Sequence, residues 1–385
     1  MRATTRVVAV AASLVLALAG CGGGDDGDDD SGSSGGGGDA ASGDLTPVTL
    51  QLQWVAQGQF AGYYAALDQG YYEDEGLDVE ILEAGPDIVP QDVLTAGDAD
   101  YAIAWVPKVL GSIEQGAAIT DVAQIFERSA TTQISFKDAG ITGPADLADK
   151  NVGSWGFGNE WELFAGMQQN GVGVDDINLV QQAFDMNAFL AGDIDAAQAM
   201  TYNEYAQVLE TVNPDTGELY SPDDLNVIDW NDVGTAMLQD AIWASTDRLE
   251  DQEYADQTVA FIKASIKGWV YARDNPEEAA SIVTAAGSTL GQSHQLWMTN
   301  EVNKLIWPST NGIGVIDDGA WAQTVEIAKS TQNETGATII TDDPPETAYS
   351  NEYVEQALDE LRDEGVDVDG ADYEPVEVTL NEGGN

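Results

Sequence analysis

Residues 48–64 read VTLQLQWVAQGQFAGYY, and this stretch decides the fold class. Its first seven residues alternate apolar and polar side chains up to Trp54, which is the pattern of a β-strand with one buried face. The apolar residues of 60–69 then recur at helical spacing until Gly70, which predicts a helix. A strand followed closely by a helix is the unit from which α/β proteins are built.

The same order of strand and helix continues along the chain. We predict a second strand over 79–82, a helix that begins near Pro90 and runs to Ala96, and a third strand over 101–105. Residues 94–105, LTAGDADYAIAW, are echoed by residues 189–200, FLAGDIDAAQAM. In both, Gly is expected to end a helix in the left-handed conformation, and the Asp pair to bond the amides of the turn. Two lobes of similar construction would produce this echo, so we predict an α/β protein with mainly parallel sheets.

The N-terminal region has the composition of an export signal followed by a linker. Arg2 and Arg6 precede an unbroken run of apolar and small residues, shorter than the about 20 residues of a membrane-spanning helix. Residues 18–21 read LAGC, the pattern of a bacterial lipobox, so residues 1–21 are predicted to be a lipoprotein signal peptide with Cys21 as lipid anchor. The alternative is an ordinary secretory signal with a chance cysteine. Residues 22–45, nearly all Gly, Asp, Ser and Ala, are predicted to form a disordered tether.

The bulk composition restricts the class of protein. The chain has 385 residues, of which 43% are hydrophobic, so it can bury the cores of two domains of ordinary size. Its single cysteine excludes disulfides and cysteine-based metal sites in the exported body. With 13 basic and 68 acidic residues the net charge is −55, which argues against nucleic acid as a partner and disfavours an anionic ligand. We interpret the acidity as a solubility or high-salt adaptation.

Candidate ligand-binding residues follow the predicted strands, because ligands of open α/β sheets bind beyond the carboxyl ends of the strands. Aromatic faces can stack on a flat heterocycle, and side-chain amides can bond to its edge. The candidates in the first part of the chain are Trp54, Gln57, Gln59, Tyr63 and Trp105. For Trp54, Phe60 and Trp105 the alternative is packing in the core.

Residues 154–161, SWGFGNEW, join a predicted strand over 151–154 to a helix from Glu160. The two glycines would let backbone amides approach a ligand. Trp155 and Phe157 are candidates for stacking on a ring, and Asn159 is a candidate ligand contact and the predicted helix N-cap. Phosphate binding is the rival use of such a loop, but this stretch holds no Lys or Arg to neutralise a phosphate.

A third group of candidates follows the echo strand, where residues 201–205 read TYNEY. The carboxylate of Glu204 can accept hydrogen bonds from an exocyclic amine or a ring imide, and the alternative is that it caps a helix in a turn. Tyr202 lies beside it, and Asp185, directly after Phe184, is a further candidate of the same kind.

Three of these runs resemble one family. Residues 53–64 (QWVAQGQFAGYY), 70–79 (GYYEDEGLDV) and 141–153 (ITGPADLADKNVG) look like segments of ABC-transporter substrate-binding proteins similar to the thiamine-pyrimidine synthase family. The resemblance is good over residues 48–249 and loose in the C-terminal helices. It implies a two-lobed, periplasmic-binding-protein-like fold of type II, with a hinge between the lobes and the ligand in the cleft. It also implies an importer, made of a permease and an ATPase, as partner.

The resemblance suggests how the chain divides. Lobe 1 is predicted to comprise residues 46–129 and 241–365, lobe 2 residues 130–240, and residues 366–385 are expected to be a loose acidic tail. By resemblance, Tyr202 and Glu204 hold the polar edge of the ligand. A ligand that contacts both lobes favours the closed state, and closure signals that the site is occupied.

Related enzymes of this fold make the thiamine pyrimidine with a histidine, bound pyridoxal phosphate and a cysteine-rich iron-binding motif. This chain has Phe60 where the resemblance places that histidine, and its only histidine, His294, lies at a predicted helix start in the C-terminal region. We therefore predict a binding protein without cofactor or metal. The alternatives are an enzyme and a membrane sensor built from the same lobes.

Few basic residues lie near the predicted cleft apart from Lys108 and Arg128, which argues against nitrate or a sulfonate, since those ligands need charge-assisted donors. We predict a neutral or weakly basic heteroaromatic ligand, either riboflavin or a thiamine pyrimidine precursor. The opening run is slightly closer to the riboflavin-type branch. We expect a monomer, lipid-anchored on the extracytoplasmic face of the cell membrane.

Overall fold

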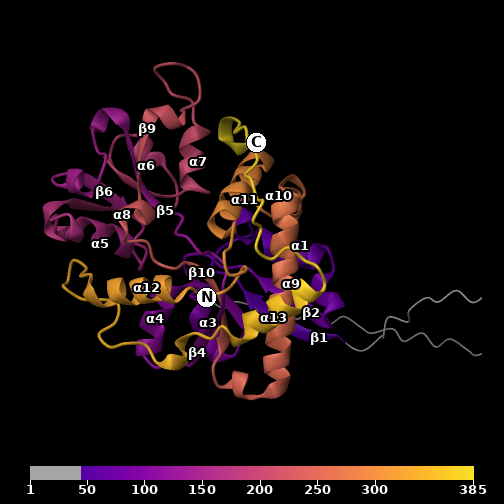
Figure 1. Ribbon diagram of the computed structural model, residues 1–385. Coiled ribbons are helices and arrows are strands. Elements are labelled where there is room, and N and C mark those ends of the chain that lie inside the picture. The colour runs from indigo at the N-terminus through magenta and orange to yellow at the C-terminus, as the bar shows by residue number, and fades with distance from the viewer. Residues whose placement is uncertain (1–44) are drawn as a thin grey trace, which may run out of the picture. The chain divides into compact units, whose positions relative to one another are not determined.

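The computed structural model describes residues 45–385 (Figure 1). The predicted signal peptide, Cys21 and nearly all of the tether lie outside the described residues. The strands are β1 (Thr46–Gln51), β2 (Leu77–Leu82), β3 (Tyr101–Trp105), β4 (Ile119–Gln124), β5 (Thr131–Phe136), β6 (Asn151–Ser154), β7 (Asn178–Gln181), β8 (Ala197–Met200), β9 (Leu225–Asp229) and β10 (Asp240–Ser245).

The helices interleave with these strands up to β10 and then follow one another to the C-terminal region. They are α1 (Ala61–Asp68), α2 (Tyr71–Asp74), α3 (Pro90–Ala96), α4 (Val106–Glu114), α5 (Trp161–Gln169), α6 (Asn187–Leu190), α7 (Glu204–Leu209), α8 (Trp230–Val233), α9 (Gln252–Asp274), α10 (Pro276–Ala285), α11 (Gln292–Ile306), α12 (Asp318–Ser330) and α13 (Glu352–Asp363). Within residues 45–385, no helix has both the length and the apolar character needed to cross a membrane.

The strands form a five-stranded sheet in the order β2-β1-β3-β10-β4, a three-stranded sheet in the order β8-β5-β9, and a β6-β7 pair. Strand β1 is parallel to β2 and β3, and β6 is parallel to β7. By contrast, β10 is antiparallel to β3 and β4, and β5 is antiparallel to β8 and β9. The predicted α/β class is confirmed, but the prediction of mainly parallel sheets is wrong. The chain leaves the first sheet through β4 and β5 and returns through β9 and β10, so its outward and return paths lie side by side in opposite directions.

Buried side chains join these two paths. Gln239, on the return path, accepts a hydrogen bond from the Ala130 amide (2.9 Å) and donates one to Thr131 Oγ1 (2.6 Å). The Glu162 carboxylate of α5 accepts from Ser129 Oγ (3.0 Å) and from the Met237 amide (2.6 Å). The five-stranded sheet thus takes its strands from residues 46–124 and 240–245, and the other two sheets from residues 131–229. The division into two hinged lobes stays a prediction.

Helices α1 and α13 lie beside the long helix α9 (Figure 1). The approach of α1 depends on glycine. A Cβ on Gly62 would lie 2.1 Å from Trp269 Cδ2, and one on Gly268 would lie 2.0 Å from the Gly62 carbonyl oxygen. Neither contact is sterically possible, so both positions require glycine for the two helices to pack this closely.

The sequence echo corresponds to a repeated structure. Gly97 follows α3 and Gly192 follows α6, with φ angles of 78° and 80°. The second aspartate of each echo was predicted to bond the amides of the turn. In the structure it accepts a hydrogen bond from a neighbouring strand instead. Asp100 Oδ2 accepts from the Thr49 amide of β1, and Asp195 Oδ2 accepts from the Asn151 amide of β6, both at 2.8 Å. Each carboxylate therefore fixes one helix–turn–strand unit to its neighbour.

The C-terminal segment is docked, so the prediction of a loose tail is wrong. Val368 is 1% exposed, and Leu380 packs against the hydrophobic cluster that contains α7. The Val376 amide donates to Asn300 Oδ1 (2.9 Å), and the Gly383 amide donates to the carbonyl oxygen of Glu210 (3.0 Å). Apolar residues spaced among the acidic ones provide these anchoring points.

Candidate functional site

A cavity of about 730 Å³ opens beyond the carboxyl ends of strands from all three sheets, within the 300–1,000 Å³ usual for small-molecule sites. It is lined by residues that follow β1, β3, β6, β7 and β8, together with segments from residues 85–91, 289–290 and 338–339. The predicted site residues in its wall are Trp54, Gln57, Gln59, Trp105, Trp155, Phe157, Asn159, Tyr202 and Glu204. The cavity wall thus contains residues that follow strands of the five-stranded sheet and residues that follow strands of the two smaller sheets.

Two predicted site residues, Tyr63 and Asp185, lie outside this wall. Tyr63 is 1% exposed, and its ring meets Trp269 edge to face at 5.5 Å, because α1 turns this side toward α9. Asp185 Oδ1 accepts from the Asn187 amide (2.9 Å) at the start of α6. Phe60 is fully buried, in agreement with its core alternative.

Aromatic rings gather in the cavity wall. The Phe184 ring lies 4.8 Å from that of Trp54 at an angle of 52°, and 6.2 Å from that of Trp155 at 16°. Phe157 is 84% exposed at the edge. The strand predicted to reach Trp54 ends at Gln51, which places Trp54 three residues beyond β1. Phe184 lies three residues beyond β7 in the same way, and this spacing was the signal from which its role could have been predicted.

A buried carboxylate behind the wall organises its polar groups. Asp240 is 2% exposed; its Oδ1 accepts from Gln53 Nε2 (2.6 Å) and Trp105 Nε1 (2.8 Å), and its Oδ2 accepts from Gln59 Nε2 (2.9 Å). Burial raises the pKa of this carboxyl to about 6, because the donors offset only part of the desolvation. Gln57 Nε2 in turn donates to Gln59 Oε1 (2.6 Å). The amide of Gln59, predicted to meet the ligand, is therefore used within the protein.

The loop after β6 is held in an uncommon conformation. Gly156, Phe157 and Gly158 all have positive φ, at 67°, 54° and 85°. Gln198 supports the loop, since its Oε1 accepts from the Trp155 amide (3.1 Å) and its Nε2 donates to the Asn159 carbonyl oxygen. Positive φ is rare for phenylalanine, and such strain concentrates at functional sites.

Two expectations for this loop are wrong. The amide of Gly156 donates to Ser154 Oγ (3.1 Å) and that of Gly158 to Glu160 Oε2 (3.0 Å), so neither is left for a ligand. Asn159 is not the N-cap of α5, because that helix begins at Trp161; its Nδ2 donates instead to the Gly156 carbonyl oxygen (2.6 Å). The sequence could not show these partners, which depend on how the loop closes on itself.

Glu204 lines the cavity at the first residue of α7 and is 3% exposed. Its Oε2 accepts from the Met200 amide and its Oε1 from Asn203 Nδ2, both at 3.0 Å. Burial raises the pKa of this carboxyl to about 7. Ligand contact and turn capping were the two alternatives for Glu204, and the structure is compatible with both, since the carboxylate caps a turn and also lines the cavity. Burial raises the pKa of the Tyr202 phenol well above its usual value, so the phenol is neutral.

Lys108 is the cationic side chain in the cavity wall, and its Nζ lies 4.8 Å from the centre of the Trp105 ring. Burial lowers the pKa of its ammonium to about 8, while the Glu160 and Asp240 carboxylates oppose this effect. Arg128, the other cation expected nearby, donates instead to the carbonyl oxygens of Leu305 (3.1 Å) and Pro308 (3.0 Å). Among residues 45–385, no three His, Cys, Asp or Glu side chains are grouped to hold a metal ion.

Comparisons with known proteins agree with this architecture. The chain is 23% identical over 249 residues to the formylaminopyrimidine-binding protein of Halalkalibacterium halodurans, covering 64% of this chain and 72% of that protein. It is 23% identical over 307 residues to the riboflavin-binding protein RibY of Chloroflexus aurantiacus, covering 75% and 82%. Other relatives carry the name of an enzyme. The 4-amino-5-hydroxymethyl-2-methylpyrimidine phosphate synthase of Aspergillus parasiticus is 24% identical over 165 residues, covering 42% and 48%.

Among solved structures, the periplasmic aliphatic sulphonate binding protein SsuA of Escherichia coli superposes with a TM-score of 0.55 at 14% identity, covering 86% of this chain and 94% of SsuA. The predicted periplasmic-binding-protein-like fold is confirmed. The family model described as NMT1/THI5 like matches residues 57–279, more than half of the chain. The chain therefore belongs to the NMT1/THI5 like family.

Proposed function

We propose that this protein is the extracytoplasmic solute-binding component of an ABC importer and that it captures a small, flat heteroaromatic compound in the cavity. The observation that carries the proposal is the group of rings from Trp54, Trp155 and Phe184, which come from loops of different sheets and line one cavity. Such rings supply faces for stacking on a planar ligand. Relatives named as binding proteins of formylaminopyrimidine and riboflavin support this ligand class.

The polar groups of the wall suit the edge of such a ring. Glu204 uses one lone pair on each carboxylate oxygen within the protein, which leaves others to accept N–H groups of a ligand. Gln57 Oε1 has no hydrogen-bond partner among residues 45–385 and belongs to a residue of the cavity wall. These two acceptors match a heterocycle that carries amine or imide N–H groups.

Binding is favoured over synthesis because the family resemblance places Phe60, whose ring lies in the core, where the related enzymes have a histidine. The histidine and the cysteine that this chain does have are used elsewhere and do not replace the catalytic groups of those enzymes. His294 is engaged by Glu210, and Cys21 belongs to the proposed lipoprotein signal.

We further propose that Cys21 carries a lipid and that residues 22–45 tether a monomeric binding domain, composed of two hinged lobes, to the extracytoplasmic face of the cell membrane. The test is fractionation of cells that express the full chain. The unaltered protein is expected in the membrane fraction, and Cys21→Ala in the soluble fraction. If the unaltered protein and Cys21→Ala divided equally between the membrane and soluble fractions, the proposal that Cys21 carries a lipid anchor would be wrong.

The ligand is tested with the Cys21→Ala protein by calorimetry with 4-amino-5-hydroxymethyl-2-methylpyrimidine and by quenching of riboflavin fluorescence. We expect a Kd in the micromolar range or tighter for at least one of them. Trp155→Ala should weaken binding by about 1 kcal/mol or more through loss of stacking. Trp321→Ala, a similarly buried tryptophan outside the cavity wall, should leave the Kd unchanged. Binding of methanesulfonate, with no response to either heterocycle, would overturn the proposal.

A further inference from the structure

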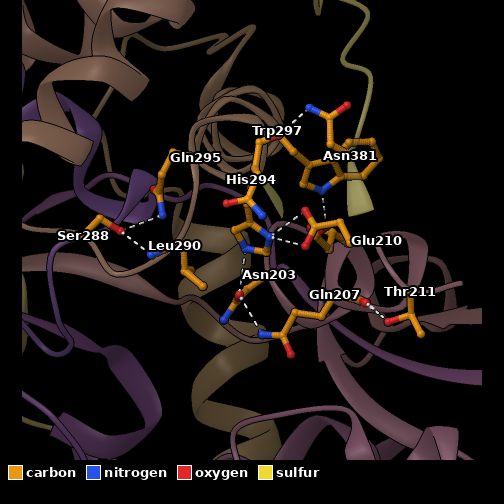
Figure 2. Close-up of polar contacts among 12 residues, drawn as sticks. Asn203, Gln207, Glu210, Thr211, Ser288, Leu290, His294, Gln295, Trp297 and Asn381 are labelled. Carbon is orange, nitrogen blue, oxygen red and sulfur yellow. Dashed lines mark hydrogen bonds and ion pairs between the residues drawn. The ribbon is translucent and has the colours of Figure 1, made fainter. Parts of the chain in front are cut away.

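His294 is the only histidine of the chain, and it contacts Asn203, a residue of the cavity wall. It is the third residue of α11, as expected for a helix start, and is 1% exposed. Its ring points toward Asn203, the residue before α7, and toward Glu210, the residue after it (Figure 2). Asn203, Glu204 and Gln207 line the cavity. Through His294, α11 thus contacts the part of the cavity wall that directly follows β8 in the chain.

Both nitrogens of the ring have oxygen partners. Nδ1 lies 2.8 Å from Glu210 Oε1 and 3.0 Å from Oε2, and Nε2 lies 3.0 Å from Asn203 Oδ1 (Figure 2). A carboxylate can only accept, so Nδ1 must carry a proton. The protonation of Nε2 then depends on which way the Asn203 amide points.

The other neighbours of Asn203 fix its amide. Its Nδ2 donates to Glu204 Oε1 (3.0 Å), and its Oδ1 accepts from Gln207 Nε2 (3.2 Å). Turning the amide over would place its oxygen against the Glu204 carboxylate and its NH₂ group against that of Gln207. The Gln207 amide can turn over in response, but a carboxylate has no proton to offer the Asn203 oxygen. The contact with Glu204 therefore keeps the amide oxygen toward His294, so that Nε2 donates to it. Both ring nitrogens therefore face acceptors, which is the hydrogen-bonding pattern of an imidazolium.

We infer that His294 is a positioning residue of the ligand site: as an imidazolium paired with Glu210, it fixes the Asn203 amide and thereby orients the cavity carboxylate of Glu204. The inference rests on the proposed function, in which Glu204 accepts N–H groups of a heteroaromatic ligand. It adds a residue of α11 that does not line the cavity to the determinants of binding.

The surroundings of the ion pair support this role. The charged side chains that face His294 are those of Glu204, the first residue of α7, and Glu210, which directly follows the last residue of α7. Tail residues 383–385 contribute no charged side chain. A Cβ on Gly384 would lie 3.1 Å from His294 Cβ and 3.1 Å from Glu210 Oε2, so the tail covers the pair closely. The positive charge of His294 opposes the effect of burial on the pKa of Glu204. The other titratable neighbour of Glu204 is Tyr202, which is neutral.

The protonation state can be measured directly, because a protein without a histidine tag gives a single histidine signal. In ¹⁵N-detected histidine spectra at pH 7, both ring nitrogens should have imidazolium chemical shifts. Glu210→Gln should convert the ring to a neutral form. A neutral tautomer in the unaltered protein at pH 7 would overturn the inference. This measurement needs no ligand, so it remains decisive even if neither heterocycle binds.

The positioning role is tested by the pH dependence of binding. Loss of the positive charge in His294→Gln or Glu210→Gln should leave more of Glu204 protonated near neutrality. We expect the Kd for 4-amino-5-hydroxymethyl-2-methylpyrimidine to rise by about fivefold at pH 7 and by less than about twofold at pH 9. Ser293→Ala, on the same turn of α11, is the control and should match the unaltered protein at both pH values. A loss of equal size at pH 7 and pH 9 would indicate a structural role only and would overturn the inference.

Discussion

Replacing Asp240 by asparagine is expected to reverse a chain of hydrogen bonds that ends in the cavity. The carboxylate accepts from Gln59, whose oxygen accepts from Gln57, so Gln57 Oε1 is left as an acceptor for the ligand. In Asp240→Asn, the remaining oxygen is held by the two donors on Oδ1, and the new NH₂ group faces Gln59. Gln59 and then Gln57 must turn over, and Gln57 presents a donor where it had presented an acceptor.

The structure gives the size of both consequences. A donor placed against a ligand N–H group loses one hydrogen bond and leaves a polar group unpaired, which costs about 2 kcal/mol, or roughly 30-fold in Kd. Stability should change little. Burial raises the pKa of Asp240 from 3.8 to about 6, so its ionisation at pH 7 costs the folded state about 3 kcal/mol. Asparagine removes this cost, which offsets the loss of a charge-assisted hydrogen bond of about 1.5–3 kcal/mol.

Calorimetric titration and thermal unfolding of the same preparations measure these two effects. Asp121→Asn provides the matched control, since Asp121 is fully buried in β4, burial raises its pKa as well, and it lies outside the cavity wall. The control should keep the Kd of the unaltered protein. If Asp240→Asn unfolds normally and binds with unchanged affinity, the proposed direction of the Gln59–Gln57 chain is refuted.

Three further predictions concern stability and charge. Burial raises the pKa of the Glu162 and Glu204 carboxyls from 4.5 to about 7. Their contribution to stability is therefore complete below pH 4.5 and is lost as the pH rises through 7. Tm should be higher at pH 5 than at pH 8, and a Tm that does not change with pH would contradict this. Gly62→Val should lower the free energy of unfolding by about 3 kcal/mol or more in urea titrations, whereas Gly85→Ala, where a Cβ meets no atom within 4 Å, should change it little. Lys108→Met should alter the Kd for a neutral heterocycle by less than about threefold, and a larger loss would indicate an anionic ligand.

Much of the fold follows from local sequence. The strand Tyr101–Trp105 was predicted to the residue, because it is an apolar run. The helix Pro90–Ala96 was predicted to begin near Pro90 and to end at Ala96, because proline and glycine mark its ends. The antiparallel course of β10 and the docking of Leu380 were not predicted. Both depend on the path of the chain between distant segments, which periodicity does not encode.

The candidate site divides in the same way. The rule that ligands bind at the carboxyl ends of strands correctly gathered Trp54, Trp105 and Trp155 into one cavity. It could not find Asp240, whose role depends on Gln53 and Trp105, 187 and 135 residues away in the sequence. Spacing identifies the residues near a site, whereas the partners that occupy each donor and acceptor are fixed by tertiary structure.

The net charge of −55 says less about the ligand than the cavity does. Burial moves the pKa of Asp240 to about 6, that of Glu204 to about 7 and that of Lys108 to about 8, so each group lies closer to its neutral form at pH 7 than it would in water. A fully charged ligand needs a fully charged partner to repay its loss of hydration. A wall of aromatic rings, beside buried groups whose charged forms are disfavoured by desolvation, recovers more free energy from stacking and from hydrogen bonds to a poorly charged ring. The local chemistry, and not the acidic surface, therefore determines the class of compound that we propose.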